Sequence, residues 1–320
     1  MNLELALAAG IASGTVLLFA AIGELFAERS GIINLGVQGM MFVGAVVGFK
    51  IGSEVDPWLG LLLAMVAGAL LASLHGIVTI HLQANQIVSG LALTFLGTGV
   101  ALVLGEGLAT SSPALLPVIS IPLLQSIPFI GPIFFHQHSI LVYFGYLLVP
   151  LASVWIFRTR PGLHLRAVGE QPSAADALGV NVYRQRYLYV MLGGALAGLA
   201  GAAITMALVP GWHADKTVIA QGWIAVALVI FGQWKPGRTM FGAYMVAFIF
   251  RLTIDLQGPK DFFGFPNIFF EYQPSTFFLG MLPYVMVIFV LIVAAREANR
   301  KRIGAPASLG LPYVRGERGH

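Results

Sequence analysis

The feature that most constrains this chain is a series of apolar stretches, several close to the roughly 20 residues that an α-helix needs to cross a lipid bilayer. The candidate spans are 3–22, 35–49, 57–80, 87–104, 139–157, 188–209, 218–231, 239–256 and 277–295. Only 10% of the residues are charged, against about 25% in a soluble domain. The sequence therefore predicts an all-α, polytopic transmembrane bundle of about 9 to 10 spans, with a broken or re-entrant helix near residues 23–36 as one way to reach the higher number.

Lysine and arginine are unevenly distributed between the two sets of loops that these spans define. If the C-terminal tail lies inside, most lysines and arginines fall in the inner loops and the tail. The exceptions are Lys50, Lys216 and Lys260, which lie on the outer side, and Arg251, which lies within a span. The positive-inside rule then predicts a transmembrane domain at 1–295, with a cytoplasmic loop at 158–187 and a basic cytoplasmic tail at 296–320. Because membrane topology accounts for the basic balance, nucleic acid is not expected as a partner.

Polar side chains inside the predicted spans need partners, because a charge near the bilayer centre costs about 2.5 to 3.5 kcal/mol even on a lenient scale. Arg251 and Asp255 are four residues apart and share a helical face, which favours a structural ion pair over a gate. Asn85, Gln86 and Thr94 lie at the start of the fourth span. They either bond across helices or line a path, and the sequence does not distinguish these two interpretations.

The stretch GELFAERSGIINLG, residues 23–36, places a polar cluster between two apolar segments. The polar residues here and just beyond are Glu24, Glu28, Arg29, Asn34 and Gln38. The two glutamates are one helical turn apart, and the arginine can pair with either of them. A Ser-Gly dipeptide then interrupts the helix. If the helix resumes after it, the Asn and the Gln are also one turn apart. A broken segment at membrane depth must be buried in protein or line water. A pathway or packing element and a cytosolic loop before a capped helix both remain open.

Glycine is abundant, at 38 residues, and it gathers where helices are expected to pack. Gly44, Gly48 and the run GGALAGLAGA at 193–202 are examples. In lipid, small residues let helix backbones approach closely and gain dispersion contacts. These glycines predict tight packing and say little about function.

Catalytic chemistry is not expected in this chain. The sequence contains no GxxxxGK[ST], HExxH or GxSxG motif and no cysteine. His136 and His138 lack the carboxylate or further histidine that a zinc site needs. We therefore expect no catalytic residue, no metal site and no cofactor bound by this chain.

The longest inner loop, RTRPGLHLRAVGEQPSAADALGVNVYRQR at 158–186, holds the most informative pattern. The piece PSAADAL lies between Gly169 and Gly179 and is flanked by five arginines. A proline start and glycine ends favour a compact helix of about two turns. Such a helix could transmit force from a soluble partner, or it could be incidental to a positively charged loop.

Three blocks of sequence resemble a known family, the permease subunits of bacterial ABC importers for simple sugars and nucleosides, which are related to branched-chain amino acid permeases. The blocks are GELFAERSGIINLGVQGMMFVGA at 23–45, LRAVGEQPSAADALGVNVYRQR at 165–186 running into GGALAGLAGA, and IAVALVIFGQWKPGRTMFGA at 224–243. The first block resembles the nucleoside branch, because sugar permeases usually carry a Gly-Ile-Asp-Leu-Ser type of segment where this chain has Gly-Ile-Ile-Asn.

The resemblance implies a subunit that forms the translocation path and couples to a separate ATPase through a helix at 165–180. Carried over by position, the coupling residues are Gly169, Glu170, Ala174, Ala175 and Gly179, with Arg166 beside them. The loop departs from the older Glu-Ala-Ala pattern, because Glu170 is separated from the alanines, as is usual in this branch.

The same resemblance implies the partners and the location. The partner ATPase binds ATP and Mg, a solute-binding protein outside the cell delivers a small polar substrate, and a second, longer permease completes a heterodimer. The location is the bacterial plasma (inner) membrane, multi-pass, with a cytoplasmic C-terminus. The alternative class is an ion-coupled secondary transporter, in which Glu24, Glu28 or Asp255 would bind a cation or a proton.

Overall fold

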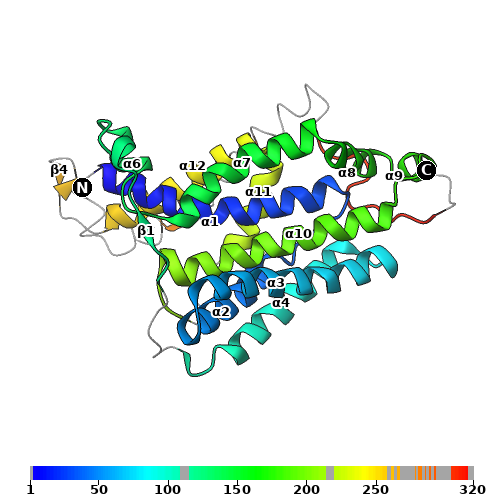
Figure 1. Ribbon diagram of the computed structural model, residues 1–320, viewed down its shortest axis with the longest axis horizontal. Coiled ribbons are helices and arrows are strands. Elements are labelled where there is room, and N and C mark those ends of the chain that lie inside the picture. The colour runs from blue at the N-terminus through cyan, green and yellow to red at the C-terminus, as the bar shows by residue number, and fades with distance from the viewer. Residues whose placement is uncertain are drawn as a thin grey trace.

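The computed structural model describes residues 3–108, 115–213, 220–257, 261–262, 265–266 and 304–315, with single positions between 278 and 292. Its long helices lie side by side along the longest axis of the molecule (Figure 1). They are α1 (Leu3–Arg29), α2 (Val37–Glu54), α3 (Pro57–Gly76), α4 (Gln86–Leu104), α7 (Ile140–Arg158), α10 (Val182–Ala203) and α12 (Pro236–Gln257). The shorter α11 (Gln221–Phe231) packs against α1, α2 and α12. Short π-helical turns, η1 (Ile77–His81) and η3 (Ile204–Leu208), extend α3 and α10.

Shorter elements occupy the two ends of the bundle (Figure 1). One end carries α5 (Pro122–Gln125), α6 (Ile130–Phe134) and the antiparallel two-residue strands β1 (Val118–Ile119) and β2 (His138–Ser139). The other end carries α8 (Arg160–Glu170) and α9 (Pro172–Ala177). A second pair of two-residue strands, β3 (Asp261–Phe262) and β4 (Phe265–Pro266), follows α12.

Six helices in the described part of the chain are long and apolar enough to cross a membrane, which confirms an all-α polytopic membrane protein. They are Glu4–Arg29, Pro57–His81, Gln86–Leu104, Ile140–Arg158, Val182–Leu208 and Pro236–Leu256. This number is below the predicted 9 to 10 for physical reasons. Gln38, Lys50 and Glu54 reduce the hydropathy of α2, α11 has only 11 residues, and the predicted span at 277–295 lies mostly outside the described residues.

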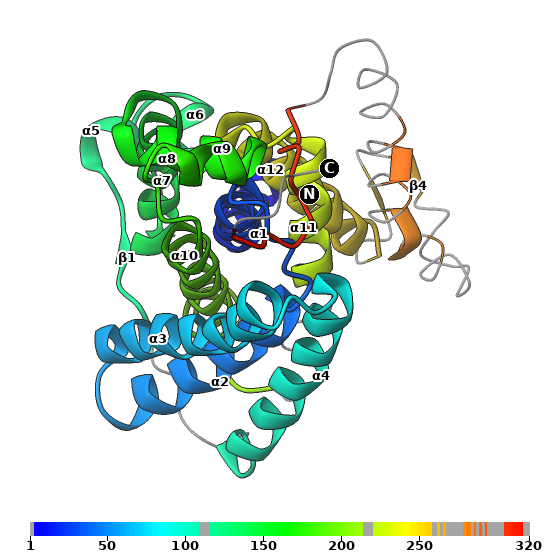
Figure 2. The ribbon, with the colours of Figure 1, turned by 90° about the vertical axis from the view of Figure 1, so that its right-hand side faces the viewer.

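Helix α1 lies in the middle of the bundle, with α10 and α12 beside it and α2 and α3 beyond α10 (Figure 2). Glycines make these close contacts, as predicted. A Cβ placed on Gly23 would lie 2.7 Å from the carbonyl oxygen of Gly193, and one on Gly48 would lie 2.6 Å from Cβ of Ala202. A Cβ on Gly44 would overlap the backbone of Gly198. Helix backbones in this region therefore touch directly, which is how dispersion stabilises helix pairs in lipid.

The C-terminal segment 304–315 lies at the same end of the bundle as α8 and α9. The amide of Ser308 donates to the carbonyl of Gly169 at 2.9 Å, and the amide of Gly310 donates to the carbonyl of Gly31 at 3.1 Å. The two segments that the charge distribution assigns to one side of the membrane therefore meet at one end of the molecule.

Candidate functional site

The polar stretch after α1 forms a buried turn between two helices. Helix α1 is continuous to Arg29, and the interruption falls at the predicted Ser-Gly dipeptide, where Gly31 has a φ of +93°. Ser30 and Asn34 are 0% exposed, so this segment is not a solvated loop. Helix α2 resumes at Val37, which places Asn34 in the turn. The condition under which Asn34 and Gln38 would lie one helical turn apart, a helix that includes both, is therefore not met.

The amide groups of this turn are bonded by buried side chains, most of them predicted from the sequence as polar candidates. The amide of Asn34 donates to Oε1 of Glu24 at 2.8 Å, and that of Ile33 donates to Oε1 of Gln86 at 2.8 Å. Asn34 in turn accepts the amide of Gly36 on its own Oδ1 at 3.0 Å. An unpaired amide would be costly at this depth, so these side chains stabilise the break in the helix.

The carbonyl groups of the turn are bonded in the same way from α3 and α4. Nε2 of His75 is 3.1 Å from the carbonyl oxygen of Ile33, and its Nδ1 is 3.0 Å from the hydroxyl of Ser89. The hydroxyl of Thr94 donates to the carbonyl of Leu35 at 3.0 Å. These bonds fit a ring protonated on Nε2. His75 was missed by sequence reasoning, although a histidine inside the predicted span 57–80 is itself a signal.

The two charged residues at the end of α1 hold the turn between α11 and α12. Oε2 of Glu28 accepts a hydrogen bond from the indole of Trp234 at 2.5 Å. The guanidinium of Arg29 donates to the backbone carbonyl of Trp234 from Nε and Nη2, at 3.2 and 2.8 Å. Among the described contacts, Arg29 forms no ion pair with Glu24 or Glu28, the two partners that the sequence offered. The reason is geometric, because Arg29 is one residue from Glu28 and five from Glu24, and neither spacing places side chains together on a helix.

Two further polar candidates accept hydrogen bonds from backbone amides in the first turn of a helix. Oε1 of Gln38 accepts the amide of Gly222 at 2.7 Å, at the beginning of α11. Oδ1 of Asn85 accepts the amides of Ile87 and Val88 at 2.9 and 3.1 Å, which makes it an exposed N-cap of α4. Both contacts satisfy amides that a helix leaves without internal partners.

Arg251 and Asp255 form an ion pair on α12 with two contacts, 2.8 Å from Nη2 to Oδ1 and 3.2 Å from Nε to Oδ2. The arginine side chain is 39% exposed on the surface of the single chain, and the aspartate is 13% exposed. A bidentate pair neutralises both charges on one helical face, as the four-residue spacing predicts.

The candidate coupling residues lie on or next to α8 and α9, and some of them are buried while others are exposed. Gly169 lies in the last turn of α8 in contact with the backbone of Arg29, so that a Cβ there would overlap the Arg29 carbonyl oxygen. Glu170 is exposed, and its Oε2 accepts the amide of Ala307 at 3.3 Å. Arg166 places its guanidinium over the ring of Phe157 at 5.8 Å.

The short helix α9 is the helix predicted between the two glycines, and Gly179 follows it with a φ of +84°. Ala174 is exposed, and Leu178 just beyond the helix is 86% exposed. Ala175 is buried at 3% exposure. The expectation that both alanines enter a partner's cleft therefore needs correction, because Ala175 points into its own chain and Ala174 points out.

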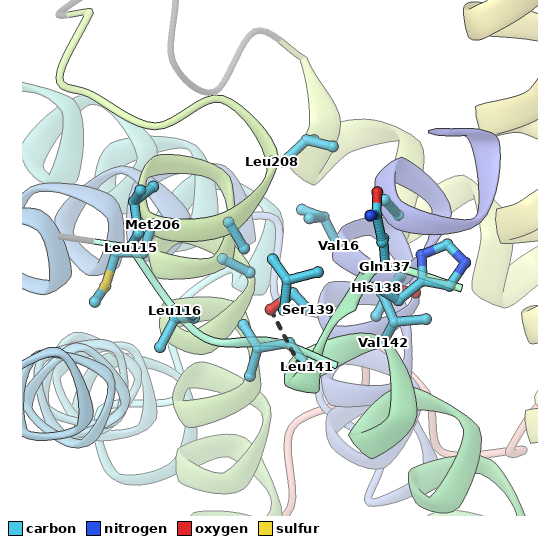
Figure 3. A pocket seen from close by; sticks show the side chains of 15 residues that line it. Val16, Leu115, Leu116, Gln137, His138, Ser139, Leu141, Val142, Met206 and Leu208 are labelled. Carbon is cyan, nitrogen blue, oxygen red and sulfur yellow. Dashed lines mark hydrogen bonds between the residues drawn. The ribbon is translucent and has the colours of Figure 1, made fainter. Parts of the chain in front are cut away.

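A cavity of about 220 Å³ lies at the opposite end, between α1, α7 and η3. Figure 3 shows Val16, Leu116, Val142 and Met206 around it, with Gln137, His138 and Ser139 on one side. Nε2 of His138 is 2.7 Å from the carbonyl oxygen of Ile133, and the side chain is buried. Within the described residues, no group of three or more His, Asp and Glu side chains is arranged to hold a metal ion.

The local stability of this end of the bundle is expected to depend on pH, because the imidazole of His138 is buried. Burial lowers the pKa of His138 from its ordinary value. Below the unfolded-state pKa of about 6.5, the unfolded imidazole binds a proton that the folded one resists, so local stability falls as the pH drops. We expect backbone amides near β2 to exchange hydrogen faster at about pH 5.5 than at about pH 7.5, after correction for intrinsic exchange. His138→Gln should lose this difference and His136→Gln should keep it; an unchanged response in His138→Gln would assign the effect to another group.

The comparisons with known proteins cover nearly the whole chain. A family model described as branched-chain amino acid transport system / permease component matches residues 6–294. The putative glucose ABC transporter permease protein TsgC13 of Haloferax volcanii is 36% identical over 96% of both chains. The nucleoside ABC transporter permease protein NupC of Lactococcus lactis is 34% identical over 98% of both, and the guanosine ABC transporter permease protein NupQ of Bacillus subtilis is 36% identical over 94% of both.

No solved structure matches this chain. The breadth of the sequence matches nevertheless leaves no large segment of the chain unaccounted for. The glycine-packed helices and the buried polar turn thus belong to a transport subunit. The chain is a member of the branched-chain amino acid transport system / permease component family, and it is a permease subunit of an ABC importer.

Proposed function

We propose that this permease carries nucleosides or simple sugars across the plasma membrane, with nucleosides favoured. The observation that carries the proposal is the identity of 34 to 36% to permeases named for nucleosides, guanosine and glucose, each matched over at least 94% of its length. The Gly-Ile-Ile-Asn sequence of the buried turn supports the nucleoside branch. The substrate is a small polar solute, handed over by a solute-binding protein outside the cell.

The proposed assembly contains a separate ATPase and a second permease, as a heterodimer. The ATPase binds ATP and Mg and contacts α9 at the cytoplasmic face, where the C-terminus also lies. The exposed Ala174 and Leu178 support this role for α9, because they leave an apolar surface at the end of the bundle. We further propose about 9 to 10 membrane passages, since α2, α11 and the segment 277–295 add to the six long apolar helices.

The proposed mechanism is alternating access driven from outside this chain. Nucleotide binding closes the ATPase dimer and moves α8 and α9. The backbone contact of Gly169 with Arg29 then carries the movement to the end of α1. The ATPase shifts the permease between states only by as much as it binds one state better than the other.

An ion-coupled secondary transporter explains the contacts less well. Glu24 accepts a backbone amide, Glu28 accepts the Trp234 indole and Asp255 pairs with Arg251. Each of the three candidate ion-binding carboxylates therefore has at least one protein partner, and within the described residues Oε2 of Glu24 has none. We assign them structural roles.

The test of the proposed function is uptake by the complete assembly, in which this permease is expressed together with its partner subunits. Uptake is measured in right-side-out membrane vesicles loaded with ATP. We expect uptake of radiolabelled guanosine to depend on ATP and to survive an uncoupler at constant ATP. Glucose uptake instead of guanosine uptake would move the substrate to sugars. Uptake that an ion gradient drives without ATP would contradict the proposal.

A substitution on α9 separates coupling from folding. Ala174→Glu places a charge on the exposed face proposed to meet the ATPase, so we expect uptake to fall by roughly tenfold or more while the subunit stays in the membrane. Ala84→Glu adds the same charge at an exposed position elsewhere at this end of the molecule and should transport normally. Equal uptake by the two variants would remove α9 from the interface.

A further inference from the structure

The C-terminal segment 304–315 is bound across the proposed coupling region by a series of specific contacts. The hydroxyl of Ser308 donates to the carbonyl of Gly169 at 2.6 Å, and the Ser308 amide donates to the same carbonyl at 2.9 Å. Arg315 pairs with Asp176 of α9 at 3.1 Å from Nε to Oδ2. Gly310 bonds the carbonyl of Gly31, in the turn that follows α1. The segment therefore touches α8, α9 and the buried turn together.

Tyr313 fixes this segment against α9. Its side chain is 7% exposed and belongs to a small apolar cluster with Val168, Ala175 and Val182, separate from the main core. The ring also lies 5.6 Å from that of Tyr183. Ala175 of α9 is thus buried in a cluster to which a residue distant in sequence contributes.

Arg186 of α10 is covered by the same segment. The side chain is 1% exposed, its guanidinium carbon lies 5.9 Å from the centre of the Tyr313 ring, and Nη1 donates to the carbonyl of Leu311 at 3.4 Å. Within the described part of the chain, Nε and Nη2 have no hydrogen-bond partner. The contacts of Arg186 with the Tyr313 ring and the Leu311 carbonyl join the segment to α10.

We propose that residues 304–315 form a strap that positions α9 for the ATPase, with Tyr313 and Ser308 as positioning residues. The inference rests on the proposed role of α9. Docking joins α8 and α9 to the turn at Gly31, so that displacement of α9 reaches the buried polar turn by a second route besides the contact between Gly169 and Arg29. Release of the strap leaves α9 attached through α8 and α10 alone, and movement of α9 is transmitted less completely.

Docking of the strap is measured by thiol labelling, which is direct because the chain contains no cysteine. A cysteine in place of Ala175 should react slowly with a maleimide in the assembled complex, because this position is buried in the cluster that Tyr313 joins. Adding Tyr313→Ala should raise the rate roughly tenfold or more, since truncating a buried aromatic commonly costs more than the about 1.4 kcal/mol that a tenfold ratio represents. A cysteine in place of Ala84, which is exposed and lies outside α9, is the control and should react fast in both backgrounds.

The functional consequence is measured in the same complex as the number of ATP molecules hydrolysed per guanosine imported. Tyr313→Ala should raise this ratio by roughly fivefold, which is the lower end of typical coupling factors, while ATP hydrolysis without guanosine stays near that of the wild type. Tyr313→Phe keeps the ring and should behave as the wild type in both assays. A chain ended before Gly304 removes the strap entirely and repeats the test if Tyr313→Ala assembles poorly.

Two outcomes would overturn the strap. One is a thiol at position 175 that stays protected in Tyr313→Ala and in the shortened chain. The other is a thiol that becomes reactive while the ratio of ATP to guanosine remains that of the wild type. Failure of the proposed function is distinguishable from both, because wild-type uptake would then lack ATP dependence while labelling at position 175 would still report docking.

Discussion

Replacing Gly201 with valine is expected to eliminate the folded permease. This glycine lies where α10 crosses α2, and a Cβ there would overlap the carbonyl oxygen of Met41 and lie 2.8 Å from the amide nitrogen of Ala45. Both contacts are with helix backbone, which cannot turn aside as a flexible side chain can. Overpacking usually costs about 1 to 3 kcal/mol, and we expect at least the upper end here, because two helices must separate.

Gly99 is the matched control for this substitution. It lies in α4, and a Cβ there would meet nothing within 4 Å. Gly99→Val should therefore give a monodisperse peak in detergent and a melting temperature close to that of the wild type. Gly201→Val should give little monodisperse protein at the same expression level. Equal yields and melting temperatures would show that α10 and α2 separate more easily than their backbone contact implies.

The second large effect is expected at Glu24, where the type of replacement decides the outcome. Glu24→Leu leaves the buried amide of Asn34 without an acceptor, and an unsatisfied buried donor costs about 1 to 3 kcal/mol. Glu24→Gln keeps the oxygen that accepts this amide and should remain folded. We therefore expect a large fall in melting temperature for Leu and a small one for Gln.

Transport by Glu24→Gln separates the two classes of transporter. If the carboxylate serves the backbone of the turn, the amide variant should import guanosine with ATP at a rate close to that of the wild type. If Glu24 binds a coupling cation or carries a proton, Gln should abolish transport while the protein stays folded. A folded, inactive Glu24→Gln variant would therefore contradict the structural role assigned here.

The polar residues at 23–36 illustrate how far sequence reasoning extends. Their presence at membrane depth predicts that the segment is buried in protein or lines water, because lipid offers no hydrogen bonds. The partners could not be predicted, since the side chains that bond the turn come from Glu24, His75, Gln86 and Thr94 on three different helices. Helical periodicity says which residues share a face of one helix, and it says nothing about which helix lies opposite.

The coupling region shows the same limit. The proline at its start and the glycines on either side predict a short helix, because both residue types restrict or free the local backbone. Ala175 faces inward in a cluster that includes Tyr313, which is far away in the sequence. A two-turn helix has too few residues for its apolar pattern to mark one side as buried.

The sequence by itself determined that this chain is a membrane-embedded helical bundle and which permease family it resembles. Both conclusions follow from apolar length and local motifs, and these do not depend on how the helices are arranged. Only the tertiary structure decided that Glu24, His75, Gln86 and Thr94 bond one broken turn and that the C-terminal segment 304–315 contacts α9. Hydrogen bonds and burial of this kind join distant segments, so they exist only once the helices have packed.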